Sequence, residues 1–488
     1  MTEEKIKELY QSLLKMLENN GHDDLDLFKL AYEYAYLAHK GQLRASGDPY
    51  ISHPLAVAQK LAELKLDMNT IIAGILHDIP EDTNYSLKDI EQNFGSEIAN
   101  LVEGITKLGK IKYRGFERYA ENLRKMFIAM SNNIRIILIK FADRIHNLKT
   151  LDSLPKDKQK RIALESLEIY APIAHRLNIG VIKSELEDLS FKYVYPEEFE
   201  WINKMIPKEY EAKGKHLEKV IQSVTEKLNE NHIPVNSITI QGRTKYLYSL
   251  FKKLQKPYIN MDMSKVYDLL ALRIILSSVA DCYTTLGIIH SLYRPVPGRI
   301  KDYIAQPKPN GYRSLHTTVF TENGEIVEFQ IRTNEMHEMA EFGIAAHWNY
   351  KECDKLGKEC FKWIDELLKW QKQIKDNEQF LKTVKFDIFQ NRIFVFTPRG
   401  DVIELPEQAS PIDFAYHVHS SLGDKCVGAK VNGQMVNLAH NLKSGDIVEI
   451  ITDKNRKTPN PDWLEMAKTS MAKNKIRTAL NKNKNPAN

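Results

Sequence analysis

The chain has 488 residues, of which 43% are hydrophobic and 27% are charged. A chain of this length and composition folds into about three globular domains, and general disorder is excluded. The net charge of +5 is too small for nucleic-acid binding over the whole surface, so any such binding has to be local. No apolar run reaches the roughly 20 residues of a membrane span.

We expect a cytoplasmic protein. The acidic, amphipathic start MTEEKIKELY lacks the apolar core of a secretory signal. The cysteines are Cys282, Cys353, Cys360 and Cys426, with no CxxC pair among them. Cysteines so few and scattered favour a reducing compartment and do not suggest a cysteine metal site.

Residues 1–195 are predicted to be all helical, since no glycine-rich strand turns interrupt them. Apolar and aromatic residues recur at helical spacing near the start. They include Leu27, Leu30, Ala31, Tyr34 and Leu37. A turn, RASGDPY, follows at 44–50, and the next helix is expected to begin near Pro54, because proline suits a first helical turn.

Histidines and acidic residues gather around these helices. His77 and Asp78 follow an apolar helix that Pro80 is expected to end or kink. Others of this kind are His53, Glu81, Asp82 and Asp143. A single histidine at a helix end is more often a structural hydrogen-bonding residue, whereas the mixed set suits a manganese, iron or zinc ion. Such an ion lowers the pKa of bound water for phosphoester cleavage.

In the middle of the chain, residues 208–232 are predicted to form a charged helix, 237–241 a strand and 243–253 a helix. Three polar side chains share one face of the last helix, namely Lys245, Ser249 and Lys252. That face can hold a triphosphate, or it can be a solvated lysine face.

Two further strands carry acidic residues within apolar sequence. Asp268 and Arg273 interrupt the strand at 266–276, and a charge there is costly unless it is paired or bound to a ligand. Asp268 is therefore either a magnesium ligand or the partner of Arg273. The strand at 326–332 alternates and has Glu328 on its polar face. Together the two carboxylates can serve a metal and a proton transfer.

Between these strands lies a polar, cationic loop, RIKDYIAQPKPNGYRSLHTT, at 299–318. Its cations and acid are Arg299, Lys301, Asp302, Lys308 and Arg313, and Tyr312 follows a Pro-Asn-Gly turn. Cations match phosphates, an aspartate can join a metal, and a ring can stack on a base. Taken alone, the loop is equally compatible with a solvated basic surface.

The region 388–453 is predicted to be a β-grasp module. Strands at 392–397 and 402–405 flank a turn, and Ser410-Pro411 has the features of a capped helix start. Asn432-Gly433 predicts a hairpin, and a last strand follows at 445–451.

Two segments flank this module. Residues 346–387 are predicted to be connecting helices. In 454–488 no acidic residue occurs after Glu465, while lysines accumulate. This segment is either a basic tail that can bind RNA through phosphates or the start of a helical domain.

The N-terminal strings RASGDPYISHP, LHDIPEDT, ENLRKM and KFADRIHNLKTL resemble the HD hydrolase domain of RelA/SpoT homologues, the (p)ppGpp alarmone enzymes. The resemblance implies a Mn²⁺ site with the ligands His53, His77, Asp78 and Asp143. It places Glu81 and Asp82 beside the attacking water. It also implies nucleotide contacts from Arg44, Ser46, Tyr50, Asn147 and Thr150. Ala45 and Pro80 depart from the family pattern without removing a ligand.

The strings GRTKYLYSLFKKL, YDLLALRIIL, PVPGRIKDYIAQPKPNGYRSLHTTV and VEFQIRTNEMHEMAEFGIAAHWNYK resemble the family's synthetase domain, which would span 196–345. The implied fold is a nucleotidyltransferase-like mixed sheet with flanking helices. The implied reaction transfers pyrophosphate from ATP to the 3′-hydroxyl of GDP or GTP. Asp268 and Glu328 would be the Mg²⁺ and catalytic carboxylates, and Tyr312 would stack on guanine. Contacts to the nucleotides are implied for Arg243, Lys245, Lys252, Lys301, Lys308, His316 and Gln330.

The segment Arg299 to Asp302 matches the RxKD form of bifunctional members, whereas synthetase-only members carry ExDD. Arg313 stands where the family usually has glutamine. The strings VFTPRGDVIELP, PIDFAYHVHSSLGDKCVGAKVNG and LKSGDIVEIIT resemble a TGS domain, which implies contact of His417 with uncharged tRNA at the ribosome. A helix-surface histidine is the alternative. The family's domains beyond TGS do not follow, and we expect a truncated chain.

The sequence supports three hypotheses. The first is an α+β multidomain enzyme that makes and destroys (p)ppGpp, with the two activities reciprocally controlled through helices at about 150–235. The second is a hydrolase-dominant enzyme whose synthetase fold senses nucleotide. The third is a tRNA- or ribosome-binding regulator with vestigial chemistry, and the retained acids and histidines speak against it. No feature of the sequence specifies an oligomeric state.

Overall fold

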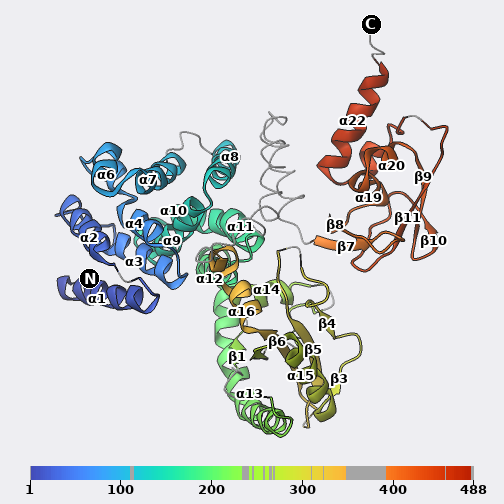
Figure 1. The fold of residues 1–488 in the computed structure, drawn as a ribbon, viewed down its shortest axis with the longest axis horizontal. Coiled ribbons are helices and arrows are strands. Elements are labelled where there is room, and N and C mark those ends of the chain that lie inside the picture. Colours follow the sequence, from blue (N-terminus) through green and yellow to red (C-terminus); the bar gives the residue numbers. More distant parts are fainter. Residues whose placement is uncertain are drawn as a thin grey trace. The chain divides into compact units, whose positions relative to one another are not determined.

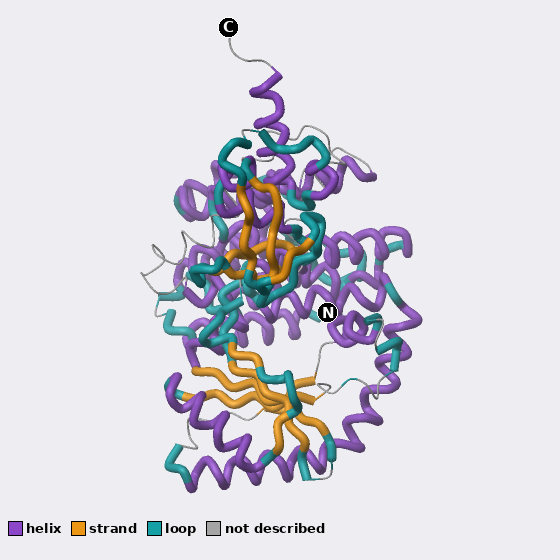
Figure 2. The backbone as a smooth tube through the Cα atoms, turned by 90° about the vertical axis from the view of Figure 1, so that its right-hand side faces the viewer, coloured by secondary structure: helices purple, strands orange, loops and turns teal. Residues whose placement is uncertain are grey.

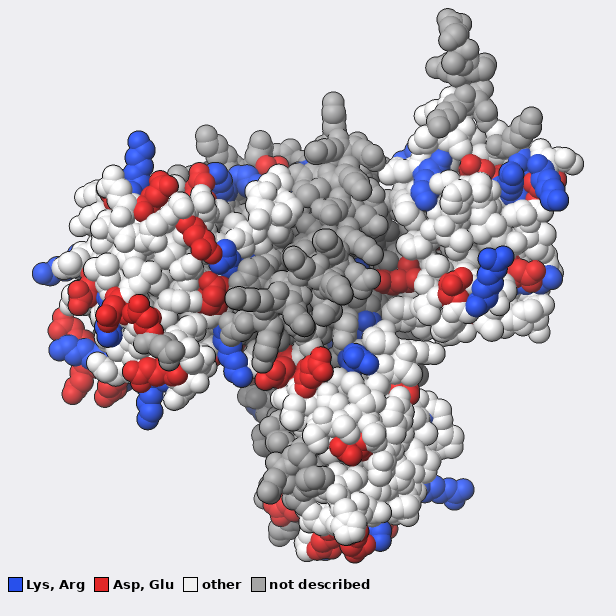
Figure 3. Space-filling view, viewed as in Figure 1, with Lys and Arg blue, Asp and Glu red and all other residues white. Residues whose placement is uncertain are grey.

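The structure is a computed structural model, and it forms two compact units, Met1–Trp370 and Gln371–Asn488 (Figure 1). It describes residues 2–22, 24–109, 115–233, 241–244, 247–256, 259–262, 266, 270–308, 310–322, 324–347, 392–456 and 458–484. Within these ranges no helix is both long and apolar enough to cross a membrane. Acidic and basic side chains are interspersed on the faces visible in Figure 3.

The first unit begins with packed helices, as predicted for residues 1–195 (Figure 1). They are α1 (Glu3–Asn19), α2 (Asp26–Ala38), α3 (Ser52–Glu63), α4 (Met68–Leu76), α5 (Ile79–Asp82), α6 (Leu87–Phe94), α7 (Ser96–Gly109), α8 (Gly115–Asn132), α9 (Arg135–Lys149), η1 (Leu151–Ser153), α10 (Lys156–Glu165), the π-helix η2 (Ser166–Tyr170), α11 (Ala171–Arg176) and α12 (Gly180–Val194). The apolar spacing near the start correctly predicted α2, but Leu27 and Leu37 are 36% and 61% exposed. The helix instead buries Phe28, Ala31 and Ala35.

Helix α4 is at the centre of this helical region. It is apolar on all sides, and Thr70 to Leu76 are buried against neighbouring helices. Its start is capped by Asp67, which accepts a hydrogen bond from the backbone N–H of Thr70. Pro80 lies in the first turn of α5, and the helix breaks at His77 and Asp78 as predicted.

A mixed sheet follows, and its strands are among those drawn in orange in Figure 2. The strand order is β1-β2-β6-β5-β3, with β4 on β5. Its strands are β1 (Gln241–Thr244), β2 (Leu270–Leu276), β3 (Arg294–Pro295), β4 (Lys301–Asp302), β5 (Leu315–Phe320) and β6 (Ile326–Thr333). Among the described strands of this sheet, β2 and β6 pair in parallel and the other pairs are antiparallel. Helices α13 (Pro196–Glu230) and α15 (Val279–Leu292) pack on the sheet with a core that includes Val224, Ile289 and Phe329.

One prediction in this region is wrong. Arg243 and Thr244 are strand residues of β1, paired with Ala271 and Leu270, and the expected helix begins only at Leu247 as α14 (Leu247–Leu254). Pairing with β2 satisfies their backbone groups and overrides the local helical pattern. The expected strand at 237–241 lies outside the described residues except for Gln241, and so do Lys245 and Asp268.

Helix α16 (Asn334–Phe342) and the 3-10 turn η5 (Gly343–His347) join the sheet to the α11–α12 turn. Asn178 Nδ2 donates to the Met339 carbonyl at 2.7 Å, and the Ile344 N–H donates to the Leu177 carbonyl at 3.3 Å. Gly343 has φ +55°, and a Cβ there would collide with the Leu177 carbonyl. The contact therefore requires glycine.

The second unit has the strand and helix order of the predicted β-grasp module. A hairpin, β7 (Arg392–Phe396) and β8 (Val402–Pro406), accompanies the sheet β10 (Gln434–Val436), β9 (Cys426–Val431) and β11 (Val448–Thr452). The capped helix is α19 (Pro411–Val418), and α20 (Ser420–Asp424) follows it. Asn432 and Gly433 have φ of 52° and 83° in the expected hairpin. The connecting helices expected at 346–387 lie outside the described residues, apart from 346 and 347 in η5.

The segment after the β-grasp strands packs against them. Helices α21 (Trp463–Met466) and α22 (Ser470–Lys484) bury Trp463 and Ile476 against Ile412 and Tyr416. The Asp413 carboxylate is fully buried at the junction. It accepts hydrogen bonds from the backbone N–H of Ser410, Lys468 and Thr469 and from the hydroxyls of Ser410 and Thr469.

We expect Asp413→Ala to lower the free energy of unfolding of the second unit by about 3–5 kcal/mol, because it leaves several buried hydrogen-bond donors without an acceptor. The loss should appear as faster amide exchange in α19 and α22 of the intact chain. Asp401→Ala, at an exposed turn where the carboxylate accepts a hydrogen bond from Thr397, is the matched control and should cost less than about 1 kcal/mol. Equal effects of the two substitutions would contradict a bridging role for Asp413.

Candidate active sites

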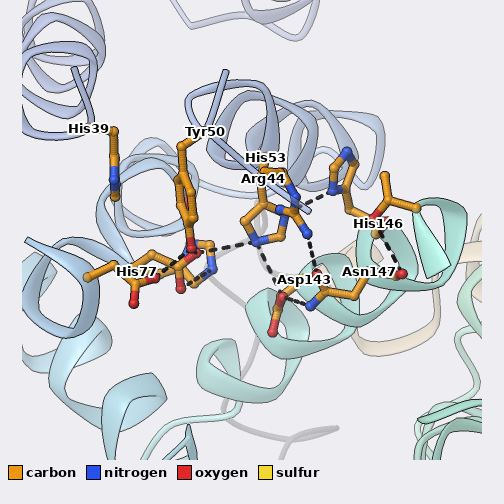
Figure 4. Close-up of polar contacts among 12 residues, drawn as sticks. His39, Arg44, Tyr50, His53, His77, Asp143, His146 and Asn147 are labelled. Carbon is orange, nitrogen blue, oxygen red and sulfur yellow. Dashed lines mark hydrogen bonds and ion pairs between the residues drawn. The ribbon is translucent and has the colours of Figure 1, made fainter. Parts of the chain in front are cut away.

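Four predicted metal ligands converge in the helical region (Figure 4). His53 comes from the first turn of α3, His77 and Asp78 from the α4–α5 break, and Asp143 from α9. His53, His77 and Asp143 are buried and offer ligand atoms that all lie within 4.8 Å of one another. Asp78 joins them, with its carboxylate 3.4 Å from His53 Nε2 and 3.0 Å from His77 Nε2.

Surrounding groups orient these side chains. His77 Nδ1 lies 2.8 Å from the Gly74 carbonyl, to which it can only donate, so Nε2 is the nitrogen that would bind a metal in place of a proton. His53 Nδ1 shares a hydrogen bond of 2.8 Å with His146 Nδ1. Lys140 Nζ lies 2.6 Å from Asp143, which also accepts from Asn147. Lys140 and His146 were not among the predicted site residues, although both lie three residues from Asp143 on the same helix.

The electrostatics of the cluster fit a bound cation. Burial lowers the pKa of His77, but Asp78 and Asp143 outweigh that effect and raise it to about 9. Burial opposes ionisation of both aspartates, yet His77 beside Asp78 and Lys140 beside Asp143 hold the pKa of each carboxyl below its usual range. His77 Nε2 is buried and makes no well-aligned hydrogen bond among the described residues. Two imidazoles and two carboxylates suit a divalent metal ion.

The predicted nucleotide contacts divide into two groups. Arg44 donates to Asn147 at 2.9 Å, and the single Tyr50 hydroxyl proton is shared between Asp78 at 2.9 Å and Asp82 at 2.6 Å. These residues border the metal cluster in Figure 4, where His39 stacks on Tyr50. The second group, Ser46 and Thr150, hydrogen-bonds to other parts of the chain. Ser46 bonds to Asp48 and Thr150 to the His146 carbonyl, while Glu81 is exposed.

A second polar site lies on β5 and β6 of the mixed sheet. The Tyr312 hydroxyl lies 2.8 Å from His316 Nε2, and His316 Nδ1 lies 3.1 Å from Glu328 Oε1. Gln330 Nε2 donates to the same Glu328 oxygen at 3.3 Å. Antiparallel pairing of the two strands places His316 opposite Gln330, which brings four predicted residues together.

Other predicted residues of the second site are placed less directly. Lys252 is exposed on α14. Lys301 of β4 lies opposite His316 of β5 in the antiparallel pairing of these two strands. Asp302 accepts hydrogen bonds from the backbone N–H of Ile304 and Ala305 and from the Tyr283 hydroxyl, so its carboxylate shapes the loop. Arg273 forms an ion pair with Glu341 at 3.0 Å, which gives it an acidic partner other than Asp268. In the second unit, His417 is exposed on α19.

Comparisons with known proteins agree with this arrangement. The HD domain model matches residues 31–180, the "Region found in RelA / SpoT proteins" matches 242–355, and the TGS domain matches 393–452. A GTP pyrophosphokinase of Myxococcus xanthus is 49% identical over 93% of this chain and 60% of that protein. The bifunctional (p)ppGpp synthase/hydrolase SpoT of Escherichia coli is 45% identical over 97% of this chain and 67% of that protein.

The chain belongs to the RelA/SpoT family. A third relative, the guanosine-3′,5′-bis(diphosphate) 3′-pyrophosphohydrolase of Aquifex aeolicus, is 48% identical over 93% of this chain and 64% of its own length. The chain thus spans less than two thirds of the Myxococcus and Aquifex proteins. The HD match includes the helices that carry the metal cluster, and the RelA/SpoT match includes β5 and β6.

Proposed function

We propose that the chain both makes and destroys (p)ppGpp. Synthesis transfers pyrophosphate from ATP to the 3′-hydroxyl of GDP or GTP, and hydrolysis returns GDP or GTP and pyrophosphate. The observation that carries the proposal is that one unit holds two separate polar sites, a buried His-Asp cluster and a Tyr312–His316–Glu328 chain. The relatives' names, which include a kinase, a hydrolase and a bifunctional enzyme, support it.

In the hydrolase site, His53, His77, Asp78 and Asp143 are the proposed metal ligands. A divalent ion bound there, which we infer is Mn²⁺, would supply a water of lowered pKa for attack on the 3′-phosphoester. Asp82, held by Tyr50 at 2.6 Å, and Glu81 are the proposed acceptors of the water's proton. Arg44 and Asn147 contact the nucleotide from the α9 side of the cluster, and Ser46 and Thr150 complete that pocket.

In the synthetase site, Glu328 is the proposed general base for the 3′-hydroxyl of GDP or GTP. The freed oxygen attacks the β-phosphorus of ATP, and AMP leaves. His316 holds Glu328 at 3.1 Å, and Tyr312 stacks on guanine. Asp268 is the proposed Mg²⁺ ligand. Arg243, Lys245, Lys252, Lys301 and Lys308 neutralise phosphate charge, which is most of what such a transfer requires.

We further propose that the two activities are reciprocally controlled. Helices α11 and α12 contact both halves of the unit. Asn310 of the cationic loop at 299–318 donates to the His175 carbonyl of α11 at 3.3 Å, and Asp188 of α12 accepts the Tyr248 N–H of α14 at 2.9 Å. A nucleotide that moves the loop therefore acts on α11, and one that moves α14 acts on α12. Simultaneous maximal synthesis and hydrolysis under one ligand condition would refute this coupling.

The two reactions are tested by assaying wild type, Asp78→Ala and Glu328→Ala for pyrophosphate transfer from ATP to GDP and for ppGpp breakdown with Mn²⁺. We expect Asp78→Ala to lose only breakdown and Glu328→Ala to lose only transfer. Absence of transfer in the wild type would favour a hydrolase-dominant protein. Absence of both reactions would favour a regulator that binds uncharged tRNA or the ribosome. We propose such binding, through His417 of the TGS domain, in addition to the two reactions.

The pH dependence of synthesis should follow Lys308. Burial, with Lys301 and Lys183 nearby, lowers the pKa of Lys308 to about 8, although Glu328 acts in the opposite direction. The ammonium is protonated below that pH and neutral above it. We therefore expect kcat/KM for GDP to fall as pH rises through about 8. Lys308→Arg keeps its charge and should move the fall to higher pH, whereas an unchanged profile would exclude Lys308 as its cause.

A further inference from the structure

Tyr303 forms one side of an aromatic cage around Lys308. The Lys308 ammonium lies 4.6 Å from the centroid of the Tyr303 ring and 4.8 Å from that of Tyr312. The Tyr303 ring meets the Tyr312 ring edge to face at 6.1 Å, and the His316 ring at 5.4 Å. Distances of this size between an ammonium and a ring centroid correspond to cation–π attraction.

The backbone around Tyr303 is held in place. Its N–H donates to the Ser314 carbonyl at 3.0 Å, and the buried Ser314 hydroxyl donates to the Ile331 carbonyl of β6 at 3.1 Å. Asp302, the preceding residue, accepts the N–H groups of Ile304 and Ala305. The ring is thus anchored to the strand next to Glu328 and not to a free loop tip.

The cage has a consequence for base stacking. Lys308 lies over one face of Tyr312, so a base that stacks on Tyr312 has to use the opposite face. The Lys308 side chain is also confined between two rings, which reduces the freedom of its ammonium before a phosphate arrives. Both effects depend on Tyr303, which touches neither base nor phosphate in this scheme.

We propose that Tyr303 is a positioning residue for the guanine nucleotide. Its ring holds Lys308 against Tyr312, and this fixes both the ring that stacks on the base and the cation that meets the phosphates. The inference rests on the proposed synthetase activity and names a residue that the family resemblance did not supply.

The test compares Tyr303→Leu with Tyr303→Phe in the full chain, with pyrophosphate transfer measured over a range of GDP and of ATP concentrations. Leucine removes the ring, and phenylalanine keeps it. We expect Tyr303→Leu to raise KM for GDP between about twofold and about thirtyfold and to leave KM for ATP within about twofold. Tyr303→Phe, which keeps the ring, should have the wild-type KM for GDP. Phe320→Leu, which removes a ring at the far end of β5, is the matched control and should change neither value.

A double-mutant cycle distinguishes an effect that acts through Lys308 from a general folding defect. If Tyr303 acts through Lys308, adding Tyr303→Leu to Lys308→Met should raise KM for GDP by much less than it does in the wild type. Additive effects, an unchanged KM in Tyr303→Leu, or an equal rise in Tyr303→Phe would each overturn the inference. A wild type that transfers no pyrophosphate would instead overturn the proposed function.

Discussion

Asp143→Asn is expected to abolish ppGpp hydrolysis, with a fall in kcat/KM of at least about a thousandfold, because the site would lose the charge that holds the proposed metal and, with that metal, a water of lowered pKa. Asp143 is 5% exposed, and its Oδ1 lies 3.4 Å from His53 Nε2. An amide is nearly the same size, but it removes the charge that holds a cation. It also leaves the Lys140 ammonium beside a neutral group.

Three measurements separate this effect from general damage. Mn²⁺ titration followed by calorimetry should show loss of the tight site, and thermal unfolding should show whether the chain stays folded. Asp152→Asn is the matched control, since Asp152 is an exposed aspartate that pairs with Lys192 at 2.9 Å, and it should hydrolyse ppGpp normally. Retention of more than about a tenth of wild-type hydrolysis with a full Mn²⁺ complement would exclude Asp143 as a ligand.

Glu328→Gln should remove pyrophosphate transfer by about 10²- to 10⁴-fold while leaving hydrolysis in place, because general bases contribute factors of that size. The amide can still bond to His316 and Gln330, whose nitrogens lie 3.1 Å and 3.3 Å from Oε1 of the glutamate. It cannot take the proton from the 3′-hydroxyl. The loss should therefore appear in kcat far more than in KM for GDP.

Glu322→Gln, at an exposed position between β5 and β6, is the control for this substitution and should leave transfer unchanged. If a higher pH restored transfer in Glu328→Gln to the wild-type rate, the base would have to be another group. If KM for GDP rose while kcat stayed constant, Glu328 would be a binding residue and not a base.

Much of both sites is predictable from sequence because the signals are local. Pro80 ends a helix through its own ring, so a break at His77 and Asp78 follows from the sequence around it. Strand alternation likewise places Glu328 and Gln330 on one face of β6. The exposure of Leu27 and Leu37 is not predictable in this way, since helical spacing indicates a face and not what covers it.

The types of reactive groups, their order and many of the helix and strand ends that carry them follow from the amino-acid sequence alone. Which of these groups meet depends on how the helices and strands pack. Packing of α3, α4 and α9 brings His53 to Asp143 and adds His146, and pairing with β2 makes Arg243 a strand residue. The loop on β4 and β5 closes Tyr303 and Tyr312 around Lys308. These contacts join residues that are distant in the chain or lie across a turn, and their stability depends on burial and pairing that no local pattern contains.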